Sequence, residues 1–462
     1  MNEEKKVQPA KKGHIRKVIT YGTFDLLHQG HVNLLRRAKA LGDYLIVGVT
    51  SEDYDRYRGK LNVRQRLLER VENVRATGLA DEIVVEEYEG QKIDDITRMG
   101  VDIFVIGSDW VGRFDYLREY CQVVYLERTK GVSSTQLRDQ NHPMIYFGIV
   151  GTGRIANRFI TESKFVSGAT VEGVYNRHRD SAAAFAERHE LSFFSDDYQS
   201  FLERVNAVYI ASPHDTRYDY AKRALLSGKH VLCEKPMSLL ESQARELFEL
   251  ARERGLILME ALKTAYCPGF MRLVSCAKSG KIGRIVSVDA TFTKLVSPQT
   301  REMKNDGVGG SVLELATYPL LAILKLLGPD YQDVRFTSFR GEEKGVDLFT
   351  RIDLTYPGAM ATAKVGLGVK SEGSLVIAGT RGYVYVPAPW WKTEYFELRY
   401  ENPADTEKDF HKFAGDGLRY EIMELLNRIS AGRMDESMCA LSCNLARVME
   451  QYRAGGSTTT IM

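Results

Sequence analysis

The chain has 462 residues, more than one hydrophobic core usually organises, so two or three compact units are expected. Hydrophobic residues make up 44% of it and charged residues 27%, and the formal net charge is only +2, with the basic residues spread along the chain rather than gathered in runs. This balance argues against a protein that binds nucleic acid, and it leaves each unit able to fold around a core of its own.

The start of the chain, MNEEKKVQPAKKGHIRK, is charged and lacks the apolar segment of a signal peptide, so residues 1–15 are expected to form a flexible, solvated tail. No apolar run reaches the roughly 20 residues needed to cross a bilayer. The six cysteines have neither zinc-type spacing nor the density of a disulfide scaffold. A cytoplasmic protein with reduced thiols and no membrane partner is therefore expected.

Two similar segments each open an α/β unit. KVITYGTFD, followed by HVNLLRRAKALG, and MIYFGIVGTGRIANRFI both predict a strand that breaks at a glycine and leads into a helix. The polar stretch TQLRDQNHP between them has the composition of a linker. The predicted boundaries are 16–139 for the first domain, 140–144 for the linker, 145–265 for a Rossmann dinucleotide-binding domain and 266–462 for an α+β substrate or oligomerisation domain.

Strands and helices alternate in both units, which predicts parallel, doubly wound sheets whose ligands bind beyond the carboxyl ends of the strands. In the first unit, strands are expected at 44–49, 82–86, 103–106 and 123–125. After Ala265, long β-rich runs predict a mostly antiparallel sheet. The closing segments, GLRYEIMELLNRISAG and the helix around 441–452, are expected to pack against that sheet.

The segment YGTFDLLHQGH places His28 and His31 three residues apart on the first turn of a helix. They share a face there, beside free backbone N–H groups and the positive end of the helix dipole, which favours a polyphosphate. Nucleotidyl transfer needs the charge on the α-phosphate neutralised and the attacking phosphate held in line, and two histidines suit that task. The same segment supplies the further predicted phosphate-site residues Gly22, Thr23, Phe24 and Asp25.

A second motif, RTKGVSST, predicts a glycine-broken turn that brings a guanidinium and several hydroxyl groups to another helix N-terminus, where anions are bound. Its predicted phosphate-binding residues are Arg128, Thr129, Ser133, Ser134 and Thr135. With both motifs in one unit, the alternative of two ordinary surface histidines loses most of its weight.

Through GTFDLLHQGH, GSDW and RTKGVSST, residues 16–139 resemble the glycerol-3-phosphate cytidylyltransferase family. The resemblance implies CTP with Mg²⁺, and histidines that bind the CTP phosphates and stabilise the transition state. It implies that Arg64 reaches the acceptor phosphate, with a solvated helix charge as the alternative, and that Asp109 and Trp110 meet the acceptor and the nucleotide. Asp25 is expected near Mg²⁺, and no set of metal ligands is assigned. The last motif has SST where the family has STT, which keeps the hydroxyl.

The second unit opens with the dinucleotide-binding pattern GTGRIA, in which an alanine replaces the third glycine. Its predicted cofactor-binding residues are Gly151, Gly153, Arg154 and Ile155. The next strand ends in VEGVYNRHRD, with Arg177 and Arg179 where a carboxylate would bind the ribose of NAD. Because arginines accommodate a 2′-phosphate, NADP is favoured over NAD, with ordinary surface charges as the alternative reading.

Further along, GKHVLCEKPMSL places Glu234, Lys235 and Pro236 directly after a buried strand, and they are predicted to line the cofactor. GGSVLELATYPL begins a helix on which Glu314 and Tyr318 lie one turn apart. A lysine and a tyrosine beside a nicotinamide ring are suited to orient a carbonyl and donate its proton while hydride adds to the carbon. The alternative for the tyrosine is a packed helix aromatic.

Through GTGRIA, EKP and IAGTRG, the chain from Ile145 to its end resembles the glucose-fructose oxidoreductase and inositol dehydrogenase family. The resemblance implies that Lys235 is catalytic and that the following motif, commonly DxxxH, supplies acid–base groups. Here Glu314 stands for the aspartate, Ala316 for the usual glycine and Tyr318 for the histidine. A tyrosine at that position is similar to the glucose-fructose oxidoreductase and dihydrodiol dehydrogenase branches.

The fusion suggests two reactions of one pathway. A keto-sugar phosphate would be reduced with NAD(P)H and the polyol phosphate coupled to CTP, giving a CDP-polyol and pyrophosphate, or a CDP-ketose would be reduced second. The resemblance implies that the product feeds a cell-surface polymer such as a teichoic acid or capsule, and a homo-oligomer is expected because oligomers are common in both families. Two alternatives stay open: a second unit that only binds NADP or holds an oligomer together, and a first unit that uses ATP.

Overall fold

The computed structural model describes residues 14–27, 29–57, 63, 65–88, 90–127, 144–304, 307, 309–341 and 345–461. The chain divides into two compact units, Met1–Met144 and Ile145–Met462. Most of the predicted linker 140–144 lies outside the described residues. No helix in the described part of the chain is long and apolar enough to cross a membrane.

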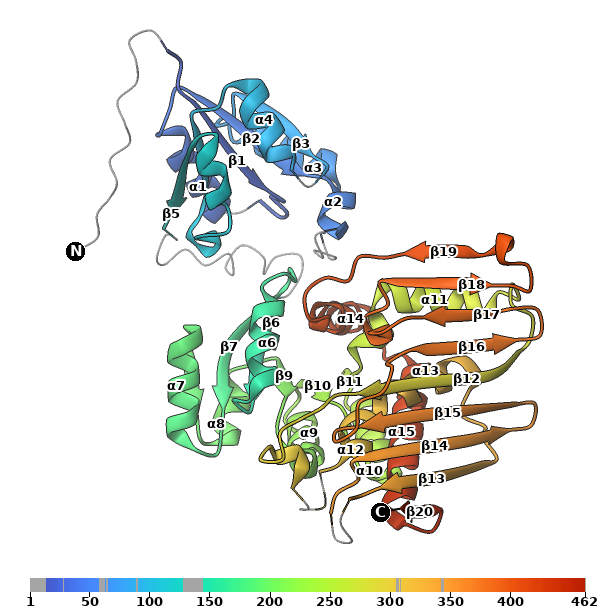
Figure 1. Cartoon of the computed structure of the whole chain (residues 1–462). Helices are drawn as coiled ribbons and strands as arrows, with labels where there is room; N and C mark the ends of the chain where they lie inside the picture. The colour runs from blue at the N-terminus through green and yellow to red at the C-terminus, as the bar shows by residue number, and fades with distance from the viewer. Residues whose placement is uncertain are drawn as a thin grey trace. The chain divides into compact units, whose positions relative to one another are not determined.

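The first unit is built on a parallel five-stranded sheet in the order β3-β2-β1-β4-β5 (Figure 1). Its strands are β1 (Lys17–Gly22), β2 (Tyr44–Thr50), β3 (Glu82–Glu86), β4 (Ile103–Gly107) and β5 (Gln122–Leu126). Its helices are α1 (Gln29–Lys39), α2 (Glu52–Tyr57), α3 (Leu67–Ala76) and α4 (Gln91–Met99), with the short turns η1 (Ser108–Trp110) and η2 (Asp115–Glu119). The predicted strands and the parallel sheet are confirmed.

Both faces of this sheet are covered, which is why its central strands are apolar almost throughout. Val18 and Leu45 pack with Leu35 of α1 and Val74 of α3 on one face. On the other face, residues of β1, β2 and β4 pack with Ile96 of α4. Side chains beyond the carboxyl ends of the strands are thereby left at one edge, between the helices.

The second unit begins with a parallel six-stranded sheet in the order β11-β10-β9-β6-β7-β8, the strand order of a dinucleotide-binding domain. The strands are β6 (Ile145–Val150), β7 (Ala169–Tyr175), β8 (Phe193–Ser195), β9 (Ala207–Ile210), β10 (His230–Glu234) and β11 (Leu258–Ala261). The helices between them are α6 (Arg154–Ser163), α7 (Arg179–His189), α8 (Tyr198–Glu203), η3 (His214–Thr216), α9 (Arg217–Leu226) and α10 (Glu241–Glu253). The predicted Rossmann fold is confirmed.

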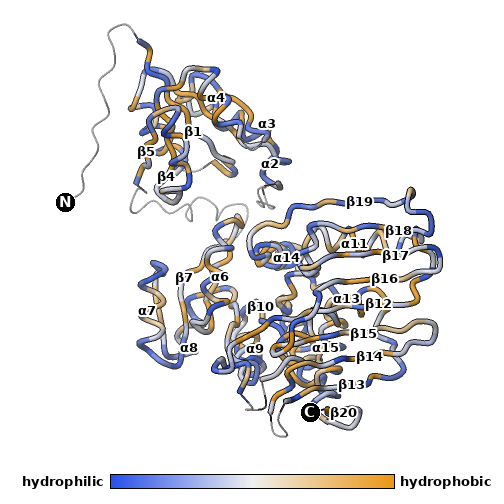
Figure 2. Tube along the Cα trace, in the orientation of Figure 1, coloured by the Kyte–Doolittle hydropathy of each residue, from blue (hydrophilic) through white to orange (hydrophobic). Residues whose placement is uncertain are grey.

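A nine-stranded sheet follows in the order β19-β18-β17-β16-β12-β15-β14-β13-β20, mostly antiparallel as predicted (Figure 1). Its strands are β12 (Ile285–Thr293), β13 (Asp333–Phe339), β14 (Phe349–Tyr356), β15 (Ala359–Gly366), β16 (Leu375–Gly379), β17 (Tyr383–Val386), β18 (Tyr395–Arg399), β19 (Glu407–Phe410) and β20 (Thr458–Ile461). Hydrophobic and hydrophilic residues alternate along strands such as β14, so one face is buried (Figure 2).

The helices of this part are η4 (Lys263–Tyr266), α11 (Pro268–Lys278), η5 (Arg301–Met303), α12 (Ser311–Leu315), α13 (Thr317–Leu327), η6 (Trp390–Lys392), η7 (Pro403–Asp405), α14 (Leu418–Ala431) and α15 (Glu436–Ala454). Of the last two, α15 contacts the sheet as expected, since the Tyr452 ring lies 5.2 Å from that of Phe336 in β13, whereas α14 differs from expectation in its packing partner. Leu418 and Ile422 of α14 join the core formed by β6 and α6, and Cys443 of α15 joins the core beneath β10 and α10. Both helices therefore complete the dinucleotide-binding core, and α15 also contacts α13.

Candidate active sites

In the first unit, the predicted phosphate-binding turn follows β1 directly. Thr23 and Asp25 are buried, and each side chain is already engaged. The Thr23 hydroxyl donates to Asp55 Oδ1 at 2.9 Å, and Asp25 Oδ1 accepts from the backbone N–H of Gln65 at 3.0 Å. Phe24 has a φ of 50°, a left-handed conformation that costs energy for a residue with a side chain and that the surrounding bonds must maintain.

His31 lies on the first turn of α1, and its ring meets the Phe24 ring edge-on at 5.4 Å. Gly22, Thr23, Phe24, Asp25 and His31 are thus brought together at one edge of the sheet. Other predicted residues of this site lie outside the described part of the chain: His28, Arg64, Arg128, Thr129, Ser133, Ser134 and Thr135.

Arg70 is the residue that sequence reasoning missed here. Its guanidinium is fully buried, and its Nη1 donates to the backbone carbonyls of Thr23 and Thr50, each at 2.7 Å. Its Nε donates to the carbonyl of Gln65 at 3.0 Å. One side chain therefore ties the turn after β1 to the end of β2 and the start of α3. The available signal was its position four residues before Val74, on the buried face of α3.

Beside the turn, the carboxyl ends of β1 and β3 hold a second buried polar group. Lys92 of α4 pairs with Glu86 and lies 4.6 Å above the ring of Tyr21. The Tyr21 hydroxyl donates to Asp95 at 2.8 Å, and burial together with that carboxylate raises the pKa of Tyr21. Trp110 lies in η1 after the adjacent strand β4, with the guanidinium of Arg113 5.3 Å from its ring. Asp109 belongs to the same turn, and its side chain lies outside the description.

In the second unit, the turn between β6 and α6 is shaped by two glycines. Gly151 has a φ of 104°, and a Cβ there would lie 3.0 Å from the carbonyl of Ala211, so a larger residue would strain the turn. Gly153 precedes α6 and has open space around it, as a close-lying phosphate requires. Arg154 is exposed and lies 3.7 Å from Glu302, while Ile155 packs against the core.

The end of β7 offers two arginines with different surroundings. Arg179 pairs with Asp196 at 3.1 Å and lies over the ring of Phe194. Arg177 is exposed and contacts the His178 ring at 3.2 Å. Asn176, which sequence reasoning did not single out, donates to the Thr152 hydroxyl at 2.8 Å and so links this strand end to the glycine turn.

The turn after β10 carries Glu234, Lys235 and Pro236, with a cis bond between the last two. Lys235 Nζ donates to the backbone carbonyl of Glu314 at 2.7 Å and lies 5.2 Å from the centre of the Tyr318 ring. Burial lowers the pKa of Lys235, whereas Glu314 and Glu234 act in the opposite direction. Burial raises the pKa of Tyr318, so its hydroxyl stays protonated. Both side chains line a small pocket together with Thr264, Thr317 and Leu321.

Glu314 and Tyr318 are one turn apart as predicted, although the helix is divided at Ala316 into α12 and α13. The Glu314 carboxylate does not contact Lys235. Its Oε1 lies 3.2 Å from Arg301 and 3.4 Å from the buried His214. Glu314 thus holds Lys235 by its backbone and two basic side chains by its carboxylate. Neither His214 nor Arg301 had a sequence signal beyond its residue type.

An aromatic wall continues outward from Tyr318. The Phe292 ring meets Tyr318 edge-on at 4.9 Å and stacks on Trp391 at 3.8 Å. Lys294 follows directly after the end of β12, two residues beyond Phe292. Burial lowers the pKa of Lys294, and the positive charge of Arg154 adds to this, so the two cations lie within electrostatic range of each other.

Comparison with known proteins decides the family of each unit. Residues 19–140 match the cytidylyltransferase-like family, residues 145–262 the oxidoreductase family with an NAD-binding Rossmann fold, and residues 270–385 the GFO/IDH/MocA C-terminal domain. Glycerol-3-phosphate cytidylyltransferase of Bacillus spizizenii is 47% identical over 129 residues, which are 27% of this chain and 95% of that protein. The chain belongs to both families.

The oxidoreductase domain has nucleotide-sugar enzymes among its relatives. dTDP-3,4-didehydro-2,6-dideoxy-alpha-D-glucose 3-reductase of Streptomyces antibioticus is 31% identical over 245 residues, 52% of this chain and 74% of that protein. A crystal structure of a 3-ketoreductase from Actinomadura kijaniata with NADP and TDP-benzene has a TM-score of 0.63 and 26% identity, and the match covers 69% of this chain and all of that one. The protein is a nucleotidyltransferase fused to an NAD(P)-dependent oxidoreductase.

Proposed function

We propose that this enzyme makes a CDP-polyol. One domain reduces a keto-sugar phosphate, or a CDP-ketose, with NAD(P)H, and the other transfers a cytidylyl group from CTP to a polyol phosphate of the glycerol or ribitol class, releasing pyrophosphate. The observation that carries the proposal is the Lys235–Tyr318 pair at the carboxyl end of a dinucleotide-binding sheet, in one chain with the engaged phosphate-binding turn at 22–25. The product would feed a cell-surface polymer such as a teichoic acid or capsule.

In the transfer half, His28 and His31 would bind the CTP phosphates and stabilise charge on the α-phosphate, with Arg128 and the hydroxyls after it on the other side. Arg64, Asp109 and Trp110 are proposed to meet the acceptor and the nucleotide. Mg²⁺ prefers a few carboxylates together with substrate phosphates. Asp25 fits that role in part, because one of its oxygens is taken by Gln65 and no cluster of three candidate ligands occurs among the described residues.

In the reduction half, bound NAD(P)H would supply hydride to the substrate carbon. Tyr318 is proposed as the donor of the proton that the carbonyl oxygen takes up, since its hydroxyl remains protonated. Lys235 would orient that oxygen and stabilise negative charge on it, as Glu314 fixes its ammonium group from behind. Glu234 and Pro236 would line the cofactor.

We propose NADP rather than NAD as the cofactor, bound by Gly151, Gly153, Arg154 and Ile155 at the phosphates and by Arg177 and Arg179 at the ribose. Asn176, rather than an acid, lies at the end of β7, and this supports a 2′-phosphate. The 3-ketoreductase crystallised with NADP supports the same choice.

A substrate with a phosphate group is supported by the charges around the pocket. Lys294 and Arg301 come from the sheet domain rather than from the cofactor turn, and both lie near Glu314, Arg301 through an ion pair at 3.2 Å and Lys294 within electrostatic range. The crystallised 3-ketoreductase carries TDP-benzene, a nucleotide-linked compound. Either a ketose phosphate or a CDP-ketose would meet this requirement.

The other candidate is a second unit that binds NADP without reducing anything and serves in a homo-oligomer. One observation favours this alternative. The Glu314 carboxylate is paired with Arg301 and His214, so it is less available as an acid or base in catalysis. A first unit that uses ATP is the remaining variant, which a panel of nucleotides would decide.

The test is a coupled assay with CTP, Mg²⁺, NADPH and a panel of ketose phosphates, in which NADPH loss and pyrophosphate release are followed separately. Pyrophosphate that appears only with NADPH present would support reduction before transfer. If pyrophosphate is released in the absence of NADPH, and NADPH added afterwards is then consumed, the result would support a CDP-ketose that is reduced second. If no ketose caused NADPH loss, the non-catalytic alternative would replace the proposal.

A further inference from the structure

Two buried, oppositely charged residues hold the turn that carries Lys235. Arg217, at the start of α9, donates from Nη1 to the backbone carbonyl of Pro236 at 3.0 Å and from Nε to the carbonyl of Ser212 at 2.9 Å. Glu260 of β11 accepts from the backbone N–H of Met237 at 2.9 Å. The turn is therefore fastened at the two residues that follow Lys235.

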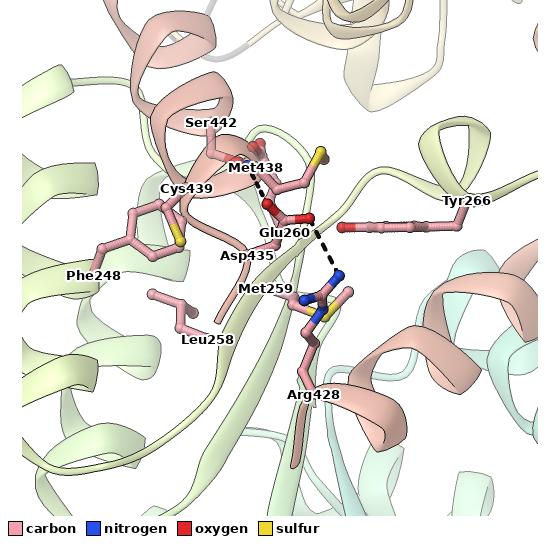
Figure 3. A pocket seen from close by; sticks show the side chains of 10 residues that line it. All are labelled: Phe248, Leu258, Met259, Glu260, Tyr266, Arg428, Asp435, Met438, Cys439 and Ser442. Atoms are coloured by element: carbon pink, nitrogen blue, oxygen red, sulfur yellow. Dashed lines mark hydrogen bonds and ion pairs between the residues drawn. The ribbon is translucent and has the colours of Figure 1, made fainter. Parts of the chain in front are cut away.

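These bonds connect three neighbouring strands of the parallel sheet. Ser212 follows β9, the turn follows β10, and Glu260 lies opposite Cys233 in the register of β10 with β11. Behind Glu260, α14 and α15 close the core, where Arg428 and Asp435 form a 3.2 Å ion pair (Figure 3). The turn thus has little freedom to shift relative to the sheet.

Charge balance explains why the two residues act together. Arg217 is 5% exposed and Glu260 is 4% exposed, and a buried charge is costly unless an opposite charge lies near it. Burial raises the pKa of Glu260, and the nearby charges of Arg217 and Lys235 oppose that rise. Loss of either member would leave the other uncompensated next to the turn.

We propose that Arg217 and Glu260 are positioning residues for the reduction, which hold Lys235 at its place beside Tyr318. This inference rests on the proposed catalytic role of Lys235. Neither residue needs to touch substrate, because each acts through the backbone of the turn, Arg217 through the Pro236 carbonyl and Glu260 through the Met237 N–H.

The pair also acts on the charge of Lys235, in opposite directions. The titratable groups that face Lys235 from the surrounding elements are Glu234, Glu314, Tyr318, Lys263, Arg217 and Glu260. Arg217 lowers the pKa of Lys235, because two cations repel each other. Lys235 in turn lowers the pKa of Glu260, because the ammonium group and the carboxylate attract each other.

The experiment compares Arg217→Met, Arg217→Lys and Glu260→Gln in the full-length enzyme. Lys235 is titrated by its rate of reductive methylation against pH, read by mass spectrometry, and ketose reduction is measured over the same pH range. Arg217→Met is expected to move both titrations to higher pH and Glu260→Gln to lower pH. Arg217→Lys keeps the positive charge, so the titration of Lys235 is expected to stay at the wild-type pH. Its kcat is expected to fall about 10- to 100-fold, because an ammonium group cannot make both hydrogen bonds of the guanidinium.

Arg223→Met on the same helix and Glu253→Gln at the end of α10 remove exposed charges and serve as matched controls. If Arg217→Met does not fold, the lysine and glutamine variants still decide the matter. If the variants oxidise NADPH but the titration of Lys235 does not shift, or shifts in the same direction in Arg217→Met and Glu260→Gln, the inference is wrong while the proposed reduction is still supported. If the Lys235 titration shifts in opposite directions but the enzyme oxidises no NADPH, the positioning of Lys235 by this pair is supported and the proposed reduction is contradicted.

Discussion

The guanidinium of Arg70 donates a 2.7 Å hydrogen bond to the backbone carbonyl of Thr23, in the middle of the turn that is predicted to bind phosphate. The same nitrogen also reaches Thr50 at the end of the adjacent strand. Because this cation is fully buried, its contacts are made in a medium of low polarity, and breaking them leaves several carbonyls without a donor.

Replacement of Arg70 by methionine is therefore expected to damage the cytidylyltransferase domain alone. Arg70 Nη1 also lies 3.7 Å from the buried carboxylate of Asp55. The free energy of unfolding of that domain should therefore fall by about 3 kcal/mol, in the range found when one member of a buried charged pair is removed. Pyrophosphate release should fall at least about tenfold, with NADPH oxidation unchanged. Arg75→Met, which removes an exposed cation from the same helix, is the control, and equal losses in both variants would contradict the assignment.

Tyr318→Phe removes the proposed proton donor with little change in packing, because the ring still fills the space beside Phe292. Ketose reduction should fall about 100-fold or more in kcat, the usual contribution of a positioned general acid. NADPH binding, followed by fluorescence, should stay the same, and so should pyrophosphate release. A variant as active as the wild type would leave Tyr318 as a packed aromatic.

Lys294→Met tests whether the reducible substrate carries a phosphate group. KM for that substrate should rise about tenfold, the equivalent of about 1.4 kcal/mol, while kcat and KM for NADPH stay near their wild-type values. Lys364→Met, on β15, removes another lysine of the same sheet and should have no effect. A rise in KM for NADPH instead would assign Lys294 to the cofactor.

The two arginines after β7 should contribute unequally to cofactor choice. Arg177→Ala is expected to raise KM for NADPH about tenfold and to leave KM for NADH unchanged, because the variant loses only the contact with the 2′-phosphate, which NADH does not have. Arg179→Ala should have a smaller effect, since Asp196 already neutralises that guanidinium. Equal effects on both cofactors would show that neither arginine reads the ribose.

Asp347 predicts a pH dependence of stability. It is buried and accepts hydrogen bonds from the backbone of Val312 and the hydroxyl of Thr350, and burial raises its pKa to about 6. The folded state binds the proton more tightly than the unfolded chain, so this stability is complete below about pH 4 and is lost as pH rises through 6. Urea unfolding of Asp347→Asn should lack that slope between pH 4 and 6, whereas the exposed Asp330→Asn should keep it.

The sequence predicted those features that depend on neighbours along the chain. The strands that open the two units follow from their apolar, β-branched runs, and the glycine turn at 151–153 follows from the positive φ and the open space that only glycine provides. Both families were recognised for the same reason, because their motifs are short and local.

Other features depend on contacts between distant segments and could not be predicted. Arg217 and Glu260 have no local pattern that separates them from ordinary helix or strand charges, and Arg70 has only its place on the buried face of α3. Their importance appears only when backbone groups of other segments lie within hydrogen-bond distance, carbonyls for the arginines and the Met237 N–H for Glu260. The amphipathic pattern of α14 correctly indicated a helix. An apolar helix face does not specify which element it packs against, so the packing of α14 against β6 and α6 could not be predicted.

The return of α14 and α15 to the dinucleotide-binding core has a consequence for synthesis of the protein. Their side chains finish a core whose strands leave the ribosome much earlier, so that core stays incomplete until the last helices are translated. The cytidylyltransferase unit, whose described core is made of its own residues, has no such delay. A nascent chain should therefore be able to acquire its first fold while its second still awaits the C-terminus.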